Sequence, residues 1–180
     1  MDLRIQKTNK AIVNAFIKLR SKKPLNKITV TELSKEAMIS KATFYLHYRD
    51  IYDLSEQLQD RLVLDILNDM PHPDRITTHP DEYTKELIAA FNANTALTNI
   101  LFPDEEKNLL AQRLEKHIKD AVYRAMPSLQ TSLEFDIALS MLIHGAFHTY
   151  QSHMNKDPDA AIECICKISL LLTDAVTGRS

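Results

Sequence analysis

The sequence predicts an all-α fold, and two observations carry that prediction. Apolar residues recur at the helical spacing i, i+3, i+4, i+7 along most of the chain, and prolines and capping residues separate the runs. Glycine is scarce, since only Gly145 and Gly178 occur among the 180 residues. Hairpin turns and phosphate-binding loops depend on residues that adopt positive φ, which glycine does most easily. β-rich and nucleotide-binding folds are therefore disfavoured.

The first predicted helix covers residues 5–22. Its apolar stripe consists of Ile12, Ala15, Phe16 and Leu19. Pro24 cannot continue a helix, so it marks the end of this one. Thr29 and Glu32 have the spacing of a capping box, in which each side chain satisfies a backbone N–H of the other residue. The second helix is therefore expected to begin at Thr29.

A third, short helix is expected after a turn of only three residues, 37–39. Ser40 can cap this helix, which is expected to end near Tyr48. Two short helices on so tight a turn are typical of a helix-turn-helix, whose second helix enters the major groove of DNA. Phe44 and Tyr48, four residues apart, are expected to face the core. The residues expected to face outward, with donors for phosphates and base edges, are Ser40, Lys41, Thr43, Tyr45 and His47. For Tyr45 and His47 the alternative is a half-buried packing role.

The rest of the chain predicts longer helices. Asp50 caps a fourth helix that runs to about Met70. Its apolar stripe consists of Ile51, Leu54, Leu58, Leu62 and Ile66. Residues 71–80 contain three prolines and are expected to form a loop. Further helices are expected over residues 81–101, 103–127, 131–154 and 158–177. The last two are apolar nearly all round, so we expect them to be buried on two sides.

Charge divides the chain into two parts. Residues 1–50 hold eleven Lys and Arg against four Asp and Glu, whereas residues 51–180 hold eleven basic residues against twenty acidic ones. A basic head on an acidic body suggests a polyanion partner for the head alone. The alternative is a solvated basic face, and Lys22, Lys23 and Lys27 are expected to be solvated charges rather than specific contacts.

Catalytic and cofactor chemistry has no recognisable motif here. The sequence contains no HExxH, GxSxG or CxxC motif and no glycine-rich phosphate motif. The acidic residues are scattered at solvent-face spacing. We therefore expect no enzyme, no cofactor and no metal. His144 and His148, four residues apart, could share a metal, but no third ligand is evident, and packing or interface roles are the favoured alternative.

The expected compartment is the cytoplasm. Lysines interrupt the N-terminal apolar runs, so no signal peptide is predicted, and no apolar stretch is long enough for a membrane span. Cys164 and Cys166 would lie on roughly opposite faces of a helix and cannot pair with each other. They are expected to be small buried hydrophobes in a reducing environment.

The run TVTELSKEAMISKATFYLHYRDIYDL, residues 29–54, resembles the helix-turn-helix signature of TetR-type transcriptional regulators, the TetR/AcrR family. The likeness extends back over the first helix. The resemblance implies that Thr43, Tyr45 and His47 lie on the recognition helix, with the tyrosine and histidine on the DNA backbone. It implies that Lys41 faces the groove or a phosphate. It also implies phosphate contacts from Thr29 and Thr31 at the start of the second helix.

Two positions depart from the family pattern. Met38 occupies the turn position usually held by glycine. If it adopts left-handed φ, the side chain costs on the order of 1 kcal/mol, and a shifted turn is the alternative. Ile51 stands where many relatives have a phosphate-binding lysine, so that contact is expected to pass to Arg49 or to backbone N–H groups.

The resemblance also implies a fold in two parts. Residues 1–50 would form a three-helix, helix-turn-helix DNA-binding domain, and residues 51–180 a helical effector-binding and dimerisation domain. The last two helices would meet their symmetry mates in a four-helix bundle, the alternative being an intramolecular core. The candidate dimer residues are Ala138, Gly145, Ser152, Ala161, Cys164, Ile168, Leu172 and Ala175. Ordinary core or surface roles are the alternative for the candidate effector-pocket residues, which are Phe91, Asn94, Phe102, His117, Tyr123 and Phe147.

The expected function is that of a homodimeric repressor, bound to a double-stranded DNA operator and released by an unidentified small-molecule effector. Two alternatives stay open. The first is a TetR-type activator, or a regulator controlled by a partner protein. The second is a pure protein-interaction module, which would lack salt-sensitive affinity for DNA.

Overall fold

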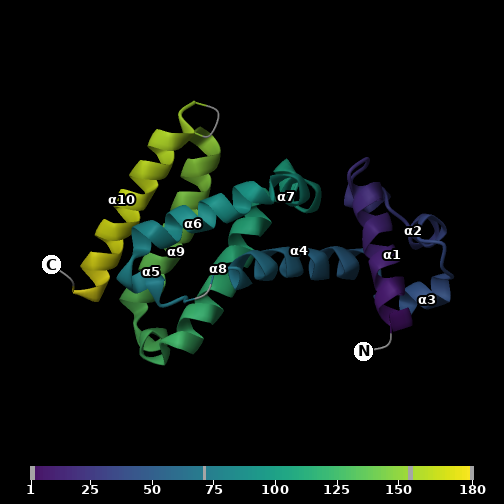
Figure 1. The fold of residues 1–180 in the computed structure, drawn as a ribbon, viewed down its shortest axis with the longest axis horizontal. Helices are drawn as coiled ribbons and strands as arrows, with labels where there is room; N and C mark the ends of the chain where they lie inside the picture. The colour runs from purple at the N-terminus through teal and green to yellow at the C-terminus, as the bar shows by residue number, and fades with distance from the viewer. Residues whose placement is uncertain (1–2, 71, 154–155, 179–180) are drawn as a thin grey trace. The chain divides into compact units, whose positions relative to one another are not determined.

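The computed structural model describes residues 3–70, 72–153 and 156–178, and that part of the chain is helical with no strand (Figure 1). The prediction of an all-α fold is confirmed. The predicted ranges 1–50, 51–180 and 131–154 each have an end outside the described residues. The helices are α1 (Leu3–Arg20), α2 (Val30–Glu36), α3 (Lys41–Tyr45), α4 (Ile51–Asn68), α5 (Arg75–Thr78), α6 (Pro80–Ala93), α7 (Thr95–Leu101), α8 (Lys107–Ala125), α9 (Leu133–His153) and α10 (Pro158–Thr177), with 3₁₀ turns at Leu25–Lys27, Asp104–Glu106 and Pro127–Thr131.

The chain forms two compact units. The first unit comprises residues 1–62 and 96–104, and the second comprises residues 63–95 and 105–180. The division falls within α4. A buried hydrogen bond from Gln59 Nε2 to the carbonyl oxygen of Leu101 (2.8 Å) ties the later segment into the first unit. The sequence predicts a boundary after residue 50 because it separates a DNA-binding domain from the rest of the chain. That functional division stays a prediction.

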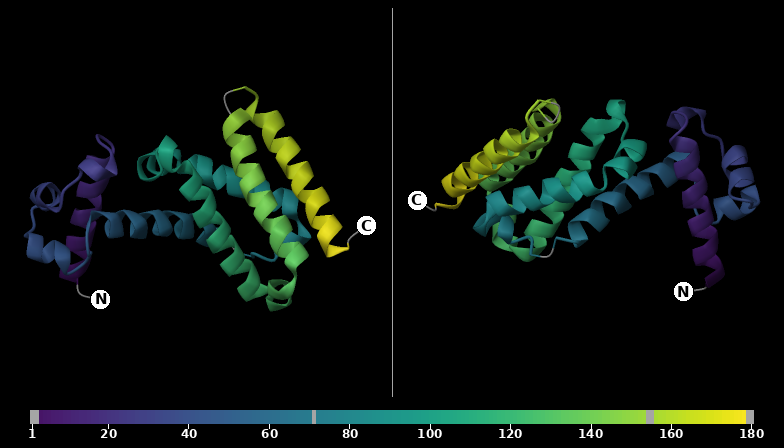
Figure 2. Two further views of the ribbon diagram at one scale, coloured as in Figure 1. Left: turned by 180° about the vertical axis from the view of Figure 1, so that it is seen from behind. Right: turned by 45° about the horizontal axis from the view of Figure 1, so that its top comes forward.

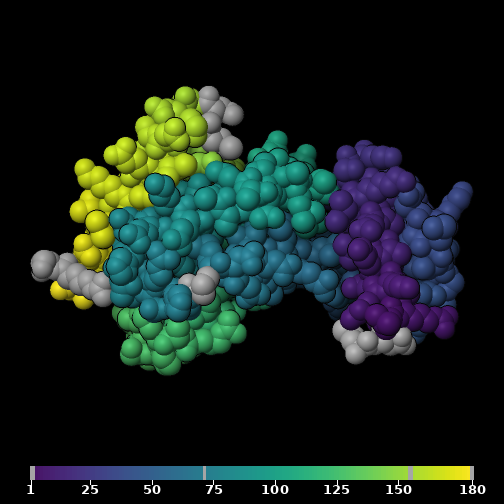
Figure 3. Space-filling view, viewed as in Figure 1, coloured from purple at the N-terminus to yellow at the C-terminus, as the bar shows by residue number. Residues whose placement is uncertain are grey.

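The first unit buries the apolar face of α1 against the short helices that follow. Figure 3 shows the purple side chains of α1 directly against the blue side chains of these helices. The predicted stripe of α1 is buried, and Leu33 and Phe44 are fully buried with it. Two ion pairs link the N-terminal segment to α2, Lys18 with Glu36 and Lys23 with Glu32. Lys23 therefore has a partner within the protein.

Side-chain caps begin the short helices where the sequence predicts them. Thr29 Oγ1 accepts a hydrogen bond from the backbone N of Glu32 (3.2 Å), and Ser40 Oγ accepts from the backbone N of Thr43 (3.0 Å). At the start of α4, Asp50 Oδ1 accepts from the backbone N of Asp53 (2.8 Å). These caps satisfy N–H groups that lack an intrahelical partner.

The second unit is built on α10, which packs against α9 and α6, while α8 packs on α9. Figures 1 and 2 show α9 and α10 side by side, running in opposite directions. The largest buried side chains here include Ile118, Val122, Phe135, Leu139 and Ile165. No described helix is long and apolar enough to cross a membrane.

Two sequence predictions in the second unit are wrong. Residues 71–80 are not simply a loop, since α5 lies within them and α6 already begins at Pro80; residue 71 is outside the described residues. Proline is tolerated in the first turn of a helix, so Pro80 marks a start rather than a break. The helix expected over residues 81–101 is divided at Asn94, whose Nδ2 donates to the carbonyl oxygen of Ala90 (2.9 Å) and ends α6.

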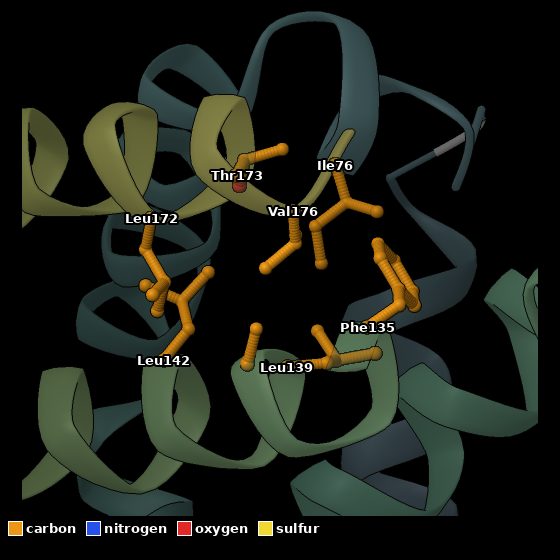
Figure 4. Close-up of a pocket in the computed structure, with 8 residues that line it drawn as sticks. Ile76, Phe135, Leu139, Leu142, Leu172, Thr173 and Val176 are labelled. Atoms are coloured by element: carbon orange, nitrogen blue, oxygen red, sulfur yellow. The ribbon is translucent and has the colours of Figure 1, made fainter. Parts of the chain in front are cut away.

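A small apolar cavity lies between α5, α9 and α10 (Figure 4). The space available to the centre of a water-sized sphere is about 10 Å³, roughly one such sphere. Its lining is aliphatic and aromatic apart from Thr173. The residues around it are Ile76, Phe135, Ala138, Leu139, Leu142, Leu172, Thr173 and Val176.

A polar cluster joins α8 to α9. Glu115 Oε1 accepts a hydrogen bond from Ser140 Oγ (2.5 Å), and Glu115 Oε2 lies 2.9 Å from His144 Nε2. Lys119 Nζ lies 3.0 Å from Glu115 Oε1 and 2.6 Å from Asp136 Oδ1. The hydrogen bond from Ser140, followed by those from His144 and Lys119, lowers the pKa of Glu115 to about 2, against 4.5 for an ordinary glutamate.

The second unit is therefore expected to lose stability in acid through Glu115. A carboxyl whose pKa is lowered by folding stabilises the protein above its unfolded pKa, and this contribution disappears as pH falls from about 4.5 to about 2. Because Glu115 is partly exposed, we expect about 1–2 kcal/mol after solvent screening. Urea unfolding at pH 7 and pH 3 should show Glu115→Gln well below the parent at pH 7, with that difference reduced by roughly half at pH 3, which lies between the two pKa values.

Glu134→Gln, which removes an exposed carboxyl of α9, is the matched control. It should leave the difference between pH 7 and pH 3 unchanged. An unchanged acid response in Glu115→Gln would show that the cluster does not stabilise the fold.

Candidate nucleic-acid interface

The eight residues predicted to contact DNA all lie in the first unit. The exposed ones are Thr29, Thr31, Ser40, Lys41, Tyr45 and Arg49, and the half-buried ones are Thr43 and His47. None of the eight is fully buried. A duplex could therefore reach at least part of each side chain.

Two aromatic residues fix the orientation of α3. Phe44 is fully buried and Tyr48 nearly so, with ring centroids 5.8 Å apart. Tyr48 Oη donates a hydrogen bond to Asn9 Oδ1 of α1 (2.5 Å), and burial raises the pKa of Tyr48. These contacts face the predicted side of α3 toward the core. Its opposite side is left toward solvent.

The predicted length of the third helix needs correction. α3 ends at Tyr45, and Leu46 is its C-cap, although the sequence places the end near Tyr48. The backbone N of His47 and that of Tyr48 both donate to the carbonyl oxygen of Phe44 (2.9 and 3.0 Å), so the chain closes in a tight turn. This turn brings Tyr48 back to the core.

Some polar groups of this surface are hydrogen-bonded within the protein, and others have no partner among the described residues. Ser40 Oγ and Thr43 Oγ1 lie 2.8 Å apart and share a hydrogen bond, and Ser40 also caps α3. Within the described part of the chain, Lys41 Nζ and Tyr45 Oη have no hydrogen bond or ion pair. Tyr45 is 57% exposed, with its ring edge-to-face on Phe44. Lys41 and Tyr45 are thus the polar groups most ready to meet a phosphate.

Arg49 is held in place by the start of α4. Asp53 Oδ2 accepts from the backbone N of Arg49 (2.8 Å), and Asp53 Oδ1 lies 3.1 Å from its guanidinium Nη2. The backbone hydrogen bond is the main reason that the pKa of Asp53 is lowered. The Arg49 side chain nevertheless remains 82% exposed. An anion could therefore reach its guanidinium group.

Met38 adopts a strained backbone conformation in the turn between α2 and α3. Its φ is 55°, in the left-handed region, and its side chain is 90% exposed. The backbone N of Met38 donates to the carbonyl oxygen of Lys35 (3.2 Å), and that of Ile39 donates to Ser34 (3.0 Å). Methionine therefore adopts the conformation that glycine favours, and the turn is not shifted.

Met38→Gly is expected to stabilise the first unit by about 0.5 kcal/mol. Glycine removes the left-handed strain of about 1 kcal/mol, and its greater freedom in the unfolded chain offsets part of the gain. Chemical denaturation measures the change. Met38→Ala, which keeps a Cβ, should show no comparable gain. Equal stability of the two variants would contradict the strain.

Only some of the candidate dimer residues are exposed. Ala138 is buried and lines the cavity of Figure 4, and Leu172 lines the same cavity and is half-buried. Both point into their own unit because α9 and α10 pack on each other. Ala161 is half-buried, and the exposed candidates are Gly145, Ser152, Cys164, Ile168 and Ala175. The exposed Cys164 also corrects the expectation that both cysteines are buried.

The sequence predicted that the last two helices are buried on two sides. In the single chain they are not. Each leaves large apolar side chains in solvent, because its neighbours within the unit cover only one face. On α9 these are Leu133, Ile137 and Met141, and on α10 they are Ile168, Leu170 and Leu171. An apolar surface of this kind is typical of an interface.

The six candidate effector residues do not line the cavity of Figure 4. Phe102 is fully buried in the first unit, whereas the others belong to the second. There His117 is buried and Phe91 is half-buried. Tyr123 Oη donates to Asp136 (2.6 Å), Asn94 ends α6, and Phe147 packs edge-to-face on His148. Structural contacts thus account for Tyr123, Asn94 and Phe147.

His144 and His148 of α9 contact other side chains. His144 contacts Glu115, and the rings of His144 and His148 stack with centroids 6.4 Å apart. Among the described residues, no group of three or more His, Cys, Asp or Glu side chains is placed to hold a metal ion.

Sequence reasoning missed two exposed apolar residues, Ala42 within α3 and Leu46 at its C-cap. Leu46 is 84% exposed and Ala42 is exposed as well. Their spacing of four residues was the available signal, but only polar side chains were considered as DNA contacts.

Comparison of the chain with protein-family models, with curated proteins and with solved structures found no match. The geometry of the first unit therefore carries the functional argument. It offers a short capped helix with one aromatic side inward, and a lysine, an arginine and a tyrosine toward solvent. Such a surface can hold a polyanion by charge and hydrogen bonding.

Proposed function

We propose that the protein is a DNA-binding transcriptional regulator of the TetR type, in which α2 and α3 form the helix-turn-helix. The observation that carries the proposal is the orientation of α3, which buries its aromatic side and exposes polar side chains to solvent. Phe44 and Tyr48 anchor one side of this helix in the core, while Lys41 and Tyr45 are exposed to solvent. The width of the major groove matches one α-helix.

The charge of the first 50 residues supports the same proposal. Eleven basic residues against four acidic ones favour a polyanion over a protein of ordinary charge. Three of the acidic groups are already occupied in the fold. Glu32 and Glu36 pair with lysines, and Asp50 caps α4. Lys41 and Arg49 remain exposed and available to a polyanion.

We further propose that the active species is a homodimer formed through the exposed faces of α9 and α10. A single head makes few contacts, and two heads on half-sites one helical turn apart add their affinities. The exposed apolar residues of both helices, such as Met141 and Ile168, provide a surface that a second copy would bury. Repression, with release by a small effector, is the regulatory mode that we propose.

The direct test is selection of DNA from a random pool by the purified protein. The selected duplex should bind with an affinity that falls steeply as salt rises, by a slope of about 0.9 per neutralised phosphate. Tyr45→Ala and His47→Ala should weaken binding about tenfold without unfolding the chain, since each loses a backbone contact.

Lys41→Ala should weaken binding and reduce the salt slope by about one. Lys22→Ala removes an exposed lysine that we expect to be solvated, and it is the matched control. Failure to select any duplex, or unchanged affinity in both the Tyr45 and His47 variants, would overturn this assignment.

A further inference from the structure

An apolar ridge occupies the outermost part of the proposed recognition helix. Leu46 is the more exposed of its two members, with 84% of its surface in solvent, and Ala42 precedes it by four residues. Isolated exposed apolar side chains are common on protein surfaces. This pair differs because it projects between the cationic and hydroxyl-bearing groups that we assign to DNA.

Helical geometry places the ridge opposite the buried anchors. Successive residues of an α-helix are rotated by about 100°, so residues two apart lie on nearly opposite sides and residues four apart lie about 40° apart. Phe44 and Tyr48 define the inward direction. Leu46, two residues from each anchor, therefore points outward, and Ala42, about 40° from Leu46, lies on the same side. The backbone of Leu46, with φ −73° and ψ −19°, keeps the helical conformation.

The polar residues of α3 lie on the flanks of this ridge. Thr43 and Tyr45 are each one residue from Phe44, about 100° to either side of the inward direction. Thr43 is half-buried and shares its hydroxyl with Ser40, whereas Leu46 is more exposed than Tyr45. If α3 enters a groove with its outward side first, the flanks meet the phosphate walls. The ridge then meets the base edges.

We propose that Ala42 and Leu46 read the methyl groups of thymine in the major groove. This inference rests on the proposed function. A leucine or alanine side chain offers no hydrogen bond, and the feature of the groove that matches it is the C5-methyl group of thymine. A base edge with only donors and acceptors would be left unpaired against leucine, at a cost in free energy. Lys41 and Arg49, exposed cations in the same stretch of the chain, favour a duplex over an apolar protein surface.

The test separates the methyl group from every other property of the base. The wild-type protein first selects a duplex from a random pool. Each thymine of that site is then replaced in turn by deoxyuridine, which lacks only the methyl group. We expect about a three- to tenfold loss of affinity at one or two positions. Leu46→Ala should abolish the difference between thymine and deoxyuridine at one of them.

Tyr45→Ala is the control within the same helix, since it should weaken binding overall while keeping the preference for thymine. Leu46→Gln provides a second, gain-of-function measurement. Glutamine pairs with adenine in the major groove, so selection with Leu46→Gln should shift the preferred base from thymine to adenine. Because Leu46 is exposed, both variants should unfold at the temperature of the parent, as circular dichroism can confirm.

Three outcomes overturn the inference. If the selected duplex binds equally well with deoxyuridine at every position, or if Leu46→Ala keeps the full preference for thymine, the ridge does not read methyl groups, although DNA binding stands. If no duplex is selected and binding does not depend on salt, the proposed function fails and the inference with it. That third result is also the one expected if the ridge binds a protein partner instead of DNA.

Discussion

Replacing Phe44 by alanine is expected to destabilise the first unit by about 3–5 kcal/mol and to abolish DNA binding. Phe44 is fully buried, and its ring contacts those of Tyr45 and Tyr48. Loss of a buried phenylalanine removes its transfer free energy and leaves a cavity, which together cost this amount. Because domains of this size are stable by only about 5–15 kcal/mol, the head would become largely or wholly unfolded at moderate temperature.

Tyr52→Ala is the matched control, since it removes an aromatic side chain from the same unit at a position that is 60% exposed. Thermal unfolding followed by circular dichroism, and anisotropy of a labelled duplex, measure the two effects. A Phe44→Ala protein that melts within a few degrees of the parent and binds DNA normally would show that α3 is not anchored as described.

Replacing Ile168 by aspartate is expected to convert the proposed dimer to monomers and to lower DNA affinity at least about 100-fold. Ile168 is 57% exposed on α10, so the substitution costs the single chain little. In a dimer that buries this face, the new carboxylate would lose its hydration without gaining a partner. Two heads on one duplex bind with a high effective concentration, and the monomer loses that advantage.

Sedimentation equilibrium measures the assembly directly. The variant should give the 20.6 kDa mass of one chain instead of twice that value. Gln130→Asp adds the same charge at an exposed site in the turn before α9 and should leave both the mass and the DNA affinity unchanged. If Ile168→Asp is still a dimer, the interface lies elsewhere on the chain. If the parent protein is a monomer, the proposed dimer does not exist.

The sequence predicted local structure best where one residue type has one physical task. Thr29, Ser40 and Asp50 begin helices because their side chains accept backbone N–H groups within three residues. It failed where the same residue type has two uses. The prolines of residues 71–80 suggested a loop, but Pro80 begins a helix, and only the packing of α5 and α6 distinguishes the two.

Helix faces were predictable only where one side of a helix is apolar. The stripe of α1 is buried as expected, because its other side is charged. α9 and α10 are apolar nearly all round, so spacing could not tell that Ala138 points inward while Ile168 points outward. Leu46 was overlooked for a different reason. The inward direction of Phe44 and Tyr48 was predicted, but only polar side chains were considered as DNA contacts on the outward side.

The five-residue length of α3 has a consequence for any attempt to copy this surface. An isolated helix of so few residues is not stable in water, since nucleation is unfavourable and too few hydrogen bonds follow it. A synthetic peptide of residues 29–48 should therefore be a random coil with little affinity for DNA. Transplanting the segment into another scaffold would require bringing Asn9 along, because the Tyr48 hydroxyl rests on that amide.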